Sequence, residues 1–237
     1  MSYLILIRHG QSEWNLENRF TGWVDVDLTQ NGKLEAEKAG YLIKKTNIKI
    51  DYYYSSFQLR ANHTLKIIQQ ILNDEKKFLK AWELNERHYG VLTGLNKIEM
   101  GQKLGEEKVL QFRRSWNLRP DPLDKKSKFH PLNIDTYKNI PIEKIPDTES
   151  LKDTYERVVN YYLLEIKNKI EKKNILISAH GNSIRALCKY LLNINEDQIS
   201  KLEIPTGNPL LLDIDENQKI HSCKYLDQDR SKDLLVF

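Results

Sequence analysis

At 237 residues, the chain is long enough for one large domain or for one domain with a sizeable insertion. Hydrophobic residues make up 40% and charged residues 30%, which argues against a disordered chain, and no apolar run approaches the about 18 residues of a membrane span. The 37 Lys and Arg against 33 Asp and Glu leave a net charge of only +4, too small to indicate nucleic acid as a partner.

The chain opens with an apolar run, YLILI from Tyr3, that leads directly into Arg8 and His9. Five apolar residues with no basic region before them are typical of a buried strand and not of a signal peptide. Without a secretion signal, we expect a cytoplasmic protein in which Cys188 and Cys223 are reduced thiols.

Helical and strand-like patterns then alternate along the chain. Thr29 is placed to cap a helix, the run IDYYYSS from Ile50 is strand-like, and apolar residues recur at helical spacing over 61–72. NILIS from Asn174 predicts another buried strand, followed directly by a helix over 184–192. PLLLDID and IHSCKYL are the last strand candidates. This alternation predicts an α/β fold of three layers, in which helices flank a mostly parallel sheet.

The pattern weakens between about residues 97 and 146, where prolines gather and charges of both signs are mixed. We interpret this segment as an insertion of short helices and loops that caps the active site. The whole chain, 1–237, is then a single domain with this cap insertion. Helical periodicity resumes at Leu151.

Two of the apolar strand candidates end in the same way, with His9-Gly10 and with His180-Gly181. In a parallel sheet the carboxyl ends of the strands meet at one edge, where ligands bind. If the two strands are neighbours about 4.8 Å apart, the imidazoles face each other across one pocket. The glycines allow the backbone to approach a ligand closely, and the helix that starts near Asn182 directs free N–H groups at an anion.

Cationic residues occur at related points of the chain: Arg8, Arg60 and the pair Arg113-Arg114. A guanidinium group binds phosphate through two parallel hydrogen bonds, and a neutral imidazole can attack phosphorus. Glu86, in the stretch ELNERHYG, is a carboxyl candidate for protonating the leaving oxygen. Together these residue types predict a site for a phosphate ester.

The same residues have other interpretations. A single histidine at a strand end is usually structural, and an arginine pair is most often part of a solvated surface. The repetition of strand, histidine and glycine favours a functional role. Metal binding is disfavoured because no His-x-x-x-His or acidic partner spacing accompanies the histidines.

Five stretches carry a resemblance to a known family: LIRHGQSEWN, RFTGWVDVDLT, LNERHYGVLTGLNK, SAHGNSIRAL and EIPTGNPL. Together they resemble the 2,3-bisphosphoglycerate-dependent phosphoglycerate mutases of the histidine phosphatase superfamily. RHG alone indicates only the superfamily, whereas FTGW, ERHYG and IPTGNP are more specific. The match runs in order from Tyr3 to about Leu226.

The resemblance implies an isomerase of glycolysis and gluconeogenesis that interconverts 3-phosphoglycerate and 2-phosphoglycerate through a phosphohistidine. It further implies 2,3-bisphosphoglycerate as the priming cofactor and no metal. The implied partners are small phosphorylated substrates and further copies of the chain, in a dimer or a tetramer, with no nucleic acid and no membrane.

The resemblance also implies roles for individual residues. His9 is the nucleophile, Glu86 is the proton donor and acceptor, and His180, Arg8 and Arg60 stabilise the transferring phosphoryl group. The implied substrate and cofactor site comprises Arg8, Ser12, Asn15, Thr21, Gly22, Arg60, Glu86, Arg87, His88, Tyr89, Lys97, Arg113, Arg114, Gly181 and Asn182.

The sequence departs from the family pattern in SSFQLRA, which still contains Arg60, and in the C-terminal stretch YLDQDRSKDLLVF. Ala- and Gly-rich tails of the family close over the site and exclude water, so this difference leaves the suppression of phosphoenzyme hydrolysis open. Two alternatives to a mutase follow. One is a phosphatase that uses the same His9 and Glu86. The other is a non-catalytic phosphate-binding module, which would require a nucleophile, an acid or an arginine to be missing.

Overall fold

The computed structural model describes residues 1–231, and the strands in that range form one six-stranded sheet. In chain order they are β1 (Ser2–Arg8), β2 (Tyr52–Ser55), β3 (Leu79–Lys80), β4 (Ile175–Ala179), β5 (Leu210–Ile214) and β6 (Ile220–Tyr225). Across the sheet their order is β3-β2-β4-β1-β5-β6. The first four strands are mutually parallel, and β5 and β6 run antiparallel at one edge. The prediction of a mostly parallel sheet is confirmed.

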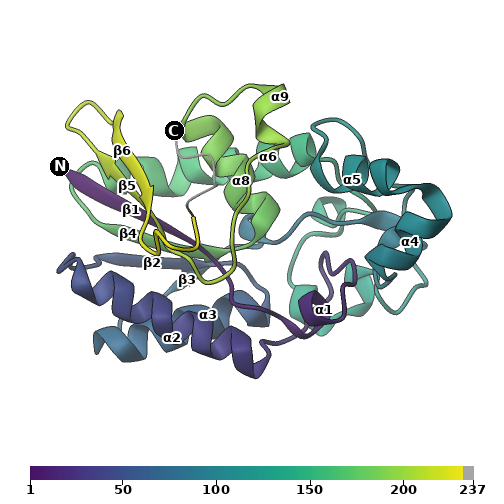
Figure 1. Ribbon diagram of the computed structural model, residues 1–237, viewed down its shortest axis with the longest axis horizontal. Helices are drawn as coiled ribbons and strands as arrows, with labels where there is room; N and C mark the ends of the chain where they lie inside the picture. The colour runs from purple at the N-terminus through teal and green to yellow at the C-terminus, as the bar shows by residue number, and fades with distance from the viewer. Residues whose placement is uncertain (232–237) are drawn as a thin grey trace.

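Helices cover both faces of this sheet. The α-helices are α1 (Glu13–Leu16), α2 (Gln30–Lys45), α3 (Leu59–Leu72), α4 (Lys97–Leu104), α5 (Glu106–Arg114), α6 (Leu151–Tyr161), α7 (Lys167–Ile170), α8 (Gly181–Leu191) and α9 (Glu196–Ile199). Helices α2 and α3 lie below the sheet in Figure 1, and α6 and α8 lie above it. The three-layer α/β architecture predicted from the sequence is therefore confirmed.

The central strand β1 shows why the apolar run is continuous. Leu4 and Leu6 pack into the core on the side of α6 and α8, whereas Ile5 and Ile7 pack on the side of α2 and α3. Successive side chains of a strand point to opposite faces, so a strand buried on both faces needs apolar residues at every position. The run ends at Arg8, where the strand leaves the core.

Helix boundaries follow the polar residues at their ends. The Thr29 hydroxyl accepts a hydrogen bond from Gly32 N at 3.0 Å, so the predicted cap of α2 is confirmed. Helix α8 begins at Gly181, immediately after β4 and His180. The helix that resumes at Leu151 continues beyond α6 through one π-helical turn (Tyr162–Ile166), which the sequence pattern did not indicate.

Short elements fill the segment interpreted as a cap. Besides α4 and α5 it contains the 3-10 turns η3 (Pro131–Asn133), η4 (Asp135–Tyr137) and η5 (Ile142–Lys144), and the turns η1 (Trp82–Leu84) and η2 (Gly90–Leu92) precede it. Helices α4 and α5 lie at the end of the sheet where β1 finishes, to the right in Figure 1. The segment therefore adjoins the sheet edge at which the two histidines were expected.

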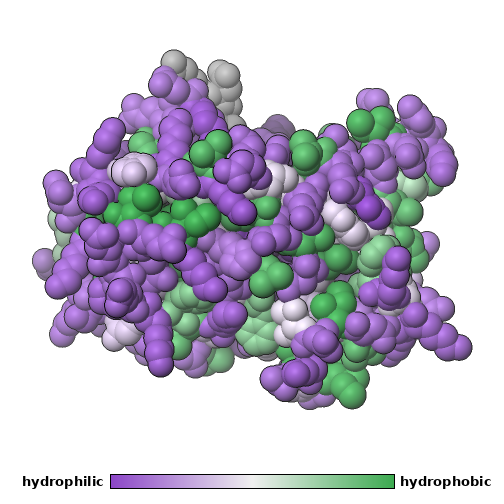
Figure 2. All heavy atoms as spheres, turned by 90° about the horizontal axis from the view of Figure 1, so that it is seen from below, coloured by the Kyte–Doolittle hydropathy of each residue, from purple (hydrophilic) through white to green (hydrophobic). Residues whose placement is uncertain are grey.

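Three further observations bear on the expectations from the sequence. Cys188 and Cys223 are both free and buried. Within 1–231, no helix combines the length and the apolar character that crossing a bilayer would require. The underside of the molecule is mainly hydrophilic, with hydrophobic side chains in smaller groups (Figure 2). The last part of the C-terminal stretch noted above, 232–237, lies outside the described residues.

Candidate active site

The two His-Gly motifs meet because β1 and β4 are neighbouring parallel strands. Arg8 pairs with Ala179 at the ends of the strands, and His9 N donates a hydrogen bond of 3.0 Å to the Ala179 carbonyl. The rings of His9 and His180 lie with their centroids 5.0 Å apart, tilted by 59°. The expected arrangement of two imidazoles at one sheet edge is present.

His9 is held as a neutral ring with one free nitrogen. Its Nδ1 lies 2.7 Å from the Gly10 carbonyl, which can only accept, so Nδ1 carries the proton and Nε2 keeps its lone pair. Burial lowers the pKa of His9 well below its usual value, and the charges of Arg60 and Arg8 lower it further. A neutral imidazole with a free Nε2 is the form that can act as a nucleophile.

His180 is also completely buried, at 0% exposure. Its Nε2 lies 2.8 Å from the hydroxyl of Ser56, which follows β2. Burial lowers the pKa of His180 well below its usual value, with Arg60 and His9 as the next causes. Both rings are therefore neutral in the free protein, and His180 is fixed in place by the residue that follows the neighbouring strand β2.

Arg8 and Arg60 are positioned by backbone carbonyls. Arg8 Nη1 donates to Ile204 O at 2.8 Å, and the two terminal nitrogens of Arg60 donate to Val24 O and Gly22 O, each at 2.9 Å. Burial is the main cause that lowers both arginine pKa values, yet a guanidinium group remains protonated in proteins. Within residues 1–231, neither group forms an ion pair with a carboxylate, so their charge is available to an anion.

Glu86 is the carboxylate of the cavity. Its Oε1 accepts hydrogen bonds from Arg87 N at 2.8 Å and from Asn182 N at 3.2 Å. Asn182 lies in the first turn of α8, where free N–H groups attract negative charge. The carboxyl group is thus oriented by the backbone of the helix that follows His180.

The segment interpreted as a cap contributes three cations from α4 and α5. Lys97 is the first residue of α4, and Arg113 and Arg114 end α5. Arg114 forms an ion pair with Glu203 and donates to Leu202 O at 3.2 Å. Burial, with the charges of Arg113 and Arg8, lowers the pKa of Lys97 to about 8.

Apart from His180, the site side chains described above line one cavity. Its lining residues are Arg8, His9, Asn15, Thr21, Gly22, Arg60, Glu86, Tyr89, Lys97, Arg113, Arg114, Gly181, Asn182 and Arg185. Among these lining residues, six are cationic and Glu86 is the one carboxylate. Such an excess of positive charge in a polar cavity suits a ligand with several negative charges.

A sequence profile of the histidine phosphatase superfamily (branch 1) matches residues 4–130 and 121–224. A 2,3-bisphosphoglycerate-dependent phosphoglycerate mutase of Pelagibacter ubique is 67% identical over 238 residues, covering 100% of both chains. A protein of the same name from Borreliella burgdorferi is 48% identical, over 92% of this chain and 88% of its own.

The chain belongs to the 2,3-bisphosphoglycerate-dependent phosphoglycerate mutase family.

The fold is shared more widely than this mutase family. The crystal structure of a putative alpha-ribazole-5'-P phosphatase from Escherichia coli superimposes with a TM-score of 0.69 at 18% identity, covering 93% of this chain and 94% of the other. At that identity the likeness concerns the fold alone. It supports the three-layer architecture described above.

Most of the residues that the resemblance to the mutases implied line the cavity, but four do not: His180, whose ring packs against His9, and Ser12, Arg87 and His88. Ser12 caps α1 and exchanges hydrogen bonds with Asn15, whose side chain reaches the cavity. Arg87 is fully buried against the Tyr89 ring, 4.8 Å from its centroid. His88 is buried too, and its Nδ1 accepts a hydrogen bond from Gly90 N at 3.0 Å. Burial lowers the pKa of His88 to about 3, so the ring is neutral.

Two residues near the mutase site were not singled out from the sequence. Arg185 lines the cavity and donates to Asn182 Oδ1 at 2.6 Å, and burial lowers its pKa to about 9. It lies four residues after Gly181, one helical turn away, so helical spacing was a usable signal. Gln58 joins two site segments: its amide nitrogen donates to Gly22 O at 2.9 Å, and its oxygen accepts from Glu86 N at 3.0 Å.

The cavity fits the bisphosphate cofactor implied by the family name. Arg8 Nε and all three guanidinium nitrogens of Arg87 are buried without a hydrogen-bond partner among the described residues. Buried donors without partners are costly in a folded protein and are usually satisfied. Of these two residues only Arg8 lines the cavity, so the site holds a spare donor as well as spare positive charge. Among residues 1–231, no group of three or more His, Cys, Asp or Glu side chains is arranged to hold a metal ion.

Proposed function

We propose that this chain interconverts 3-phosphoglycerate and 2-phosphoglycerate through a phosphohistidine at His9. One observation carries the proposal: a neutral His9 with a free Nε2 faces a cavity lined by six cations and the carboxyl group of Glu86. A nucleophile, an acid–base group and counter-charges for phosphate are the parts that phosphoryl transfer needs.

The first half-reaction transfers a phosphoryl group to the chain. His9 Nε2 attacks phosphorus in line with the leaving oxygen, the P–O bond breaks, and Glu86 gives its proton to that oxygen. Arg8, Arg60 and His180 surround the transferring group and stabilise the charge on its equatorial oxygens. When bound, 2,3-bisphosphoglycerate supplies the phosphoryl group that charges His9.

The second half-reaction reverses these roles on another hydroxyl. Glu86, now ionised, takes the proton of the attacking hydroxyl, and His9 Nε2 is the leaving group. The ligand stays in the cavity between the two halves, so its carboxylate and remaining phosphate must be held. Lys97, Arg113 and Arg114 are candidates for this role, since they line the cavity and come from α4 and α5.

The proposal includes chemistry without a metal. The neutralisation that a divalent cation gives a phosphoryl group is supplied here by guanidinium and ammonium groups. It also includes a cap function for residues 97–146, a dimeric or tetrameric assembly and a cytoplasmic location. The family resemblance supports these points, and sedimentation velocity tests the assembly.

The test is isomerisation of 3-phosphoglycerate in EDTA, with and without trace 2,3-bisphosphoglycerate, while inorganic phosphate is measured in parallel. We expect strong stimulation by the bisphosphate and little phosphate release. Phosphate release without isomerisation would contradict the proposal and support a phosphatase that uses the same His9 and Glu86. Binding without either reaction would support a phosphate-binding module.

A further inference from the structure

Arg157, in α6, holds the backbone that carries Glu86, although it does not line the cavity. Its Nη1 donates to Glu83 O at 2.6 Å and to Asn85 O at 2.9 Å, and its Nη2 donates to Glu86 O at 3.0 Å. Three carbonyls within four residues thus converge on one guanidinium group. Few side chains other than arginine present donors in a planar fork of this kind.

The remaining donors of Arg157 are used by Glu149. Nε donates to Glu149 Oε1 at 2.7 Å and Nη2 to Oε2 at 3.0 Å, and the two side chains are only 9% and 5% exposed. With the three carbonyls, all five N–H groups of the guanidinium are satisfied. Removing one member of a buried, fully satisfied pair leaves an uncompensated charge, so the pair strongly favours this one arrangement.

Glu149 fixes the same segment from its other end. His88 N donates to Glu149 Oε2 at 2.8 Å, and Glu149 N donates to His88 O at 3.0 Å. The Arg157–Glu149 pair therefore holds the segment 83–88 both before and after Glu86.

The peptide groups of Glu86 are consequently held on both sides. Gln58 accepts from its N–H at 3.0 Å, and Arg157 donates to its carbonyl. With the main chain held there, the carboxyl group has only its own side-chain torsions left, and Arg87 N and Asn182 N fix these by binding Oε1. A proton donor needs a placement of this kind, because its heavy atoms must come within hydrogen-bond distance of the leaving oxygen.

We propose that Arg157, together with Glu149, is a positioning residue. It holds the carboxyl group of Glu86 where it can exchange a proton with the oxygen that leaves or attacks the phosphoryl group at His9. It acts through Glu86 and not through the ligand, because the ligand-binding cations lie on other elements. The inference rests on the proposed function for its kinetic consequences, whereas the hydrogen-bond geometry stands independently of it.

A double-mutant cycle tests the proposal. Arg157→Met is expected to lower kcat about 100-fold and to change KM by less than about threefold, because misplacing a catalytic group affects chiefly the transition state. If Arg157 acts through Glu86, the Arg157→Met/Glu86→Gln variant is as slow as Glu86→Gln alone. Independent losses that multiply would overturn the proposal.

A second readout does not depend on activity. Hydrogen exchange of the amides in 83–88 is expected to quicken in Arg157→Met, while exchange in β1 and β4 stays unchanged. Unchanged exchange in 83–88 would overturn the proposal that Arg157 holds this segment. If the wild-type chain failed to interconvert the phosphoglycerates, the proposed function would be wrong. The exchange measurement would still test whether Arg157 holds the segment 83–88.

Three further variants distinguish the positioning role of Arg157 from a general effect of its charge or on folding. Arg157→Lys keeps the charge but not the fork, so it is expected to remain slow, and recovery of wild-type kcat would overturn the proposal. Arg157→Met/Glu149→Gln avoids a buried unpaired carboxylate and covers the case in which the single variant does not fold. Arg119→Met is the matched control. It removes an exposed ion pair with Asp153, which lies on α6 as Arg157 does, and it is expected to keep wild-type kcat.

Discussion

The two walls of the cavity are built in different ways. The inner wall consists of His9 and Arg60, which follow β1 and β2. The ring of His180, which follows β4, packs against His9, and all three residues are at most 3% exposed. The outer wall consists of Lys97 and Arg113, which belong to the short helices of the cap and are half-buried. Sheet pairing fixes the inner wall, whereas the outer wall depends on long side chains from two short helices, α4 and α5.

Under the proposed function, this difference separates chemistry from ligand retention. Groups on neighbouring strands cannot shift without breaking the sheet, so they suit a reaction that needs fixed distances. Long cationic side chains suit the recognition of a charged ligand that must turn between two half-reactions. Substitutions in the inner wall should therefore lower kcat, and those in the outer wall should raise KM.

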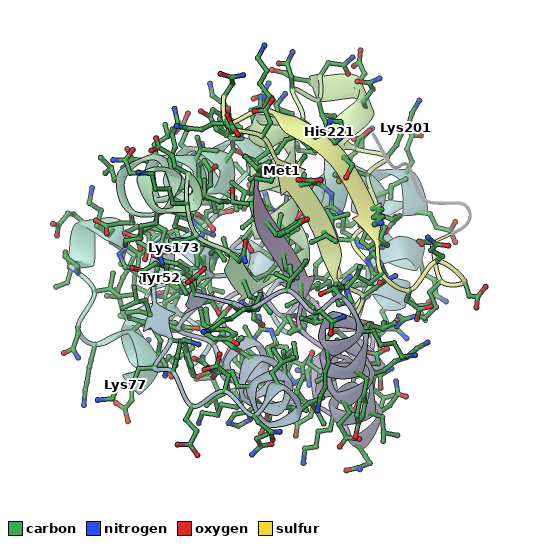
Figure 3. All side chains as sticks on the ribbon, turned by 90° about the vertical axis from the view of Figure 1, so that its left-hand side faces the viewer. Met1, Tyr52, Lys77, Lys173, Lys201 and His221 are labelled. Carbon is green, nitrogen blue, oxygen red and sulfur yellow. The ribbon has the colours of Figure 1, made fainter. Side chains whose placement is uncertain are left out.

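The largest effect is expected at the centre of the inner wall. His9→Ala removes the phosphoryl acceptor and should lower kcat by about 10⁶-fold, the scale found when a nucleophile is removed from a catalytic unit. Binding of the bisphosphate, measured by calorimetry, should largely persist. His221→Ala is the control, since His221 is exposed at the opposite end of the molecule, where β1 starts (Figure 3). Near-wild-type turnover of His9→Ala would break the assignment.

The next largest effect is expected for Glu86, the proposed proton donor and acceptor. Glu86→Gln should lower kcat by about 10²- to 10⁴-fold with little change in KM, because general acid–base catalysis contributes on this scale at the transition state. Steady-state kinetics over a range of 3-phosphoglycerate concentrations measure both constants. Glu99→Gln, an exposed carboxyl group in the first turn of α4, should behave as wild type. A change confined to KM would place Glu86 with the ligand-binding groups instead.

The outer wall should respond in the opposite sense. Arg113→Met removes a cation from the cavity lining and should raise KM by about 10- to 100-fold, as expected for the loss of a charge-assisted hydrogen bond, with kcat nearly unchanged. Lys103→Met, an exposed cation on α4, is the matched control. If Arg113→Met lowered kcat and left KM alone, the division between the two walls would be wrong.

The smallest effect is a pH dependence in the outer wall. With a pKa of about 8, Lys97 is charged below pH 8 and loses its proton as the pH rises. Because only the charged form attracts phosphate, kcat/KM should fall about fivefold between pH 8 and pH 9. Lys97→Arg keeps its charge and should abolish this fall. The same decline in both proteins would assign it to another group.

The inner wall was largely predictable from the sequence. Apolar runs that end in His-Gly place His9 and His180 at strand ends, and the geometry of parallel sheets brings such ends together. Arg60 follows a strand in the same way. What the pattern did not supply was the order of the strands, and only the observed pairing of β1 with β4 makes the two histidines neighbours.

The positioning groups were not predictable in this way. Arg157 and Glu86 are 71 residues apart, and Gln58 and Glu86 are 28 apart, so no local periodicity joins them. In the cap, residue type and resemblance indicated Lys97 and Arg113, but the lowered pKa of Lys97 arises from burial that only the folded chain creates. The functional roles of these residues stay predictions.

The most direct test of the account is to follow a labelled phosphoryl group through His9. The chain is charged with ³²P-labelled 2,3-bisphosphoglycerate in EDTA, the labelled residue is mapped, and the isolated phosphoprotein is mixed with 3-phosphoglycerate. We predict label on His9, about one per chain by the proposed stoichiometry, and its transfer to the 2-position of phosphoglycerate. Label on another residue, or its release only as inorganic phosphate, would contradict the proposed mutase.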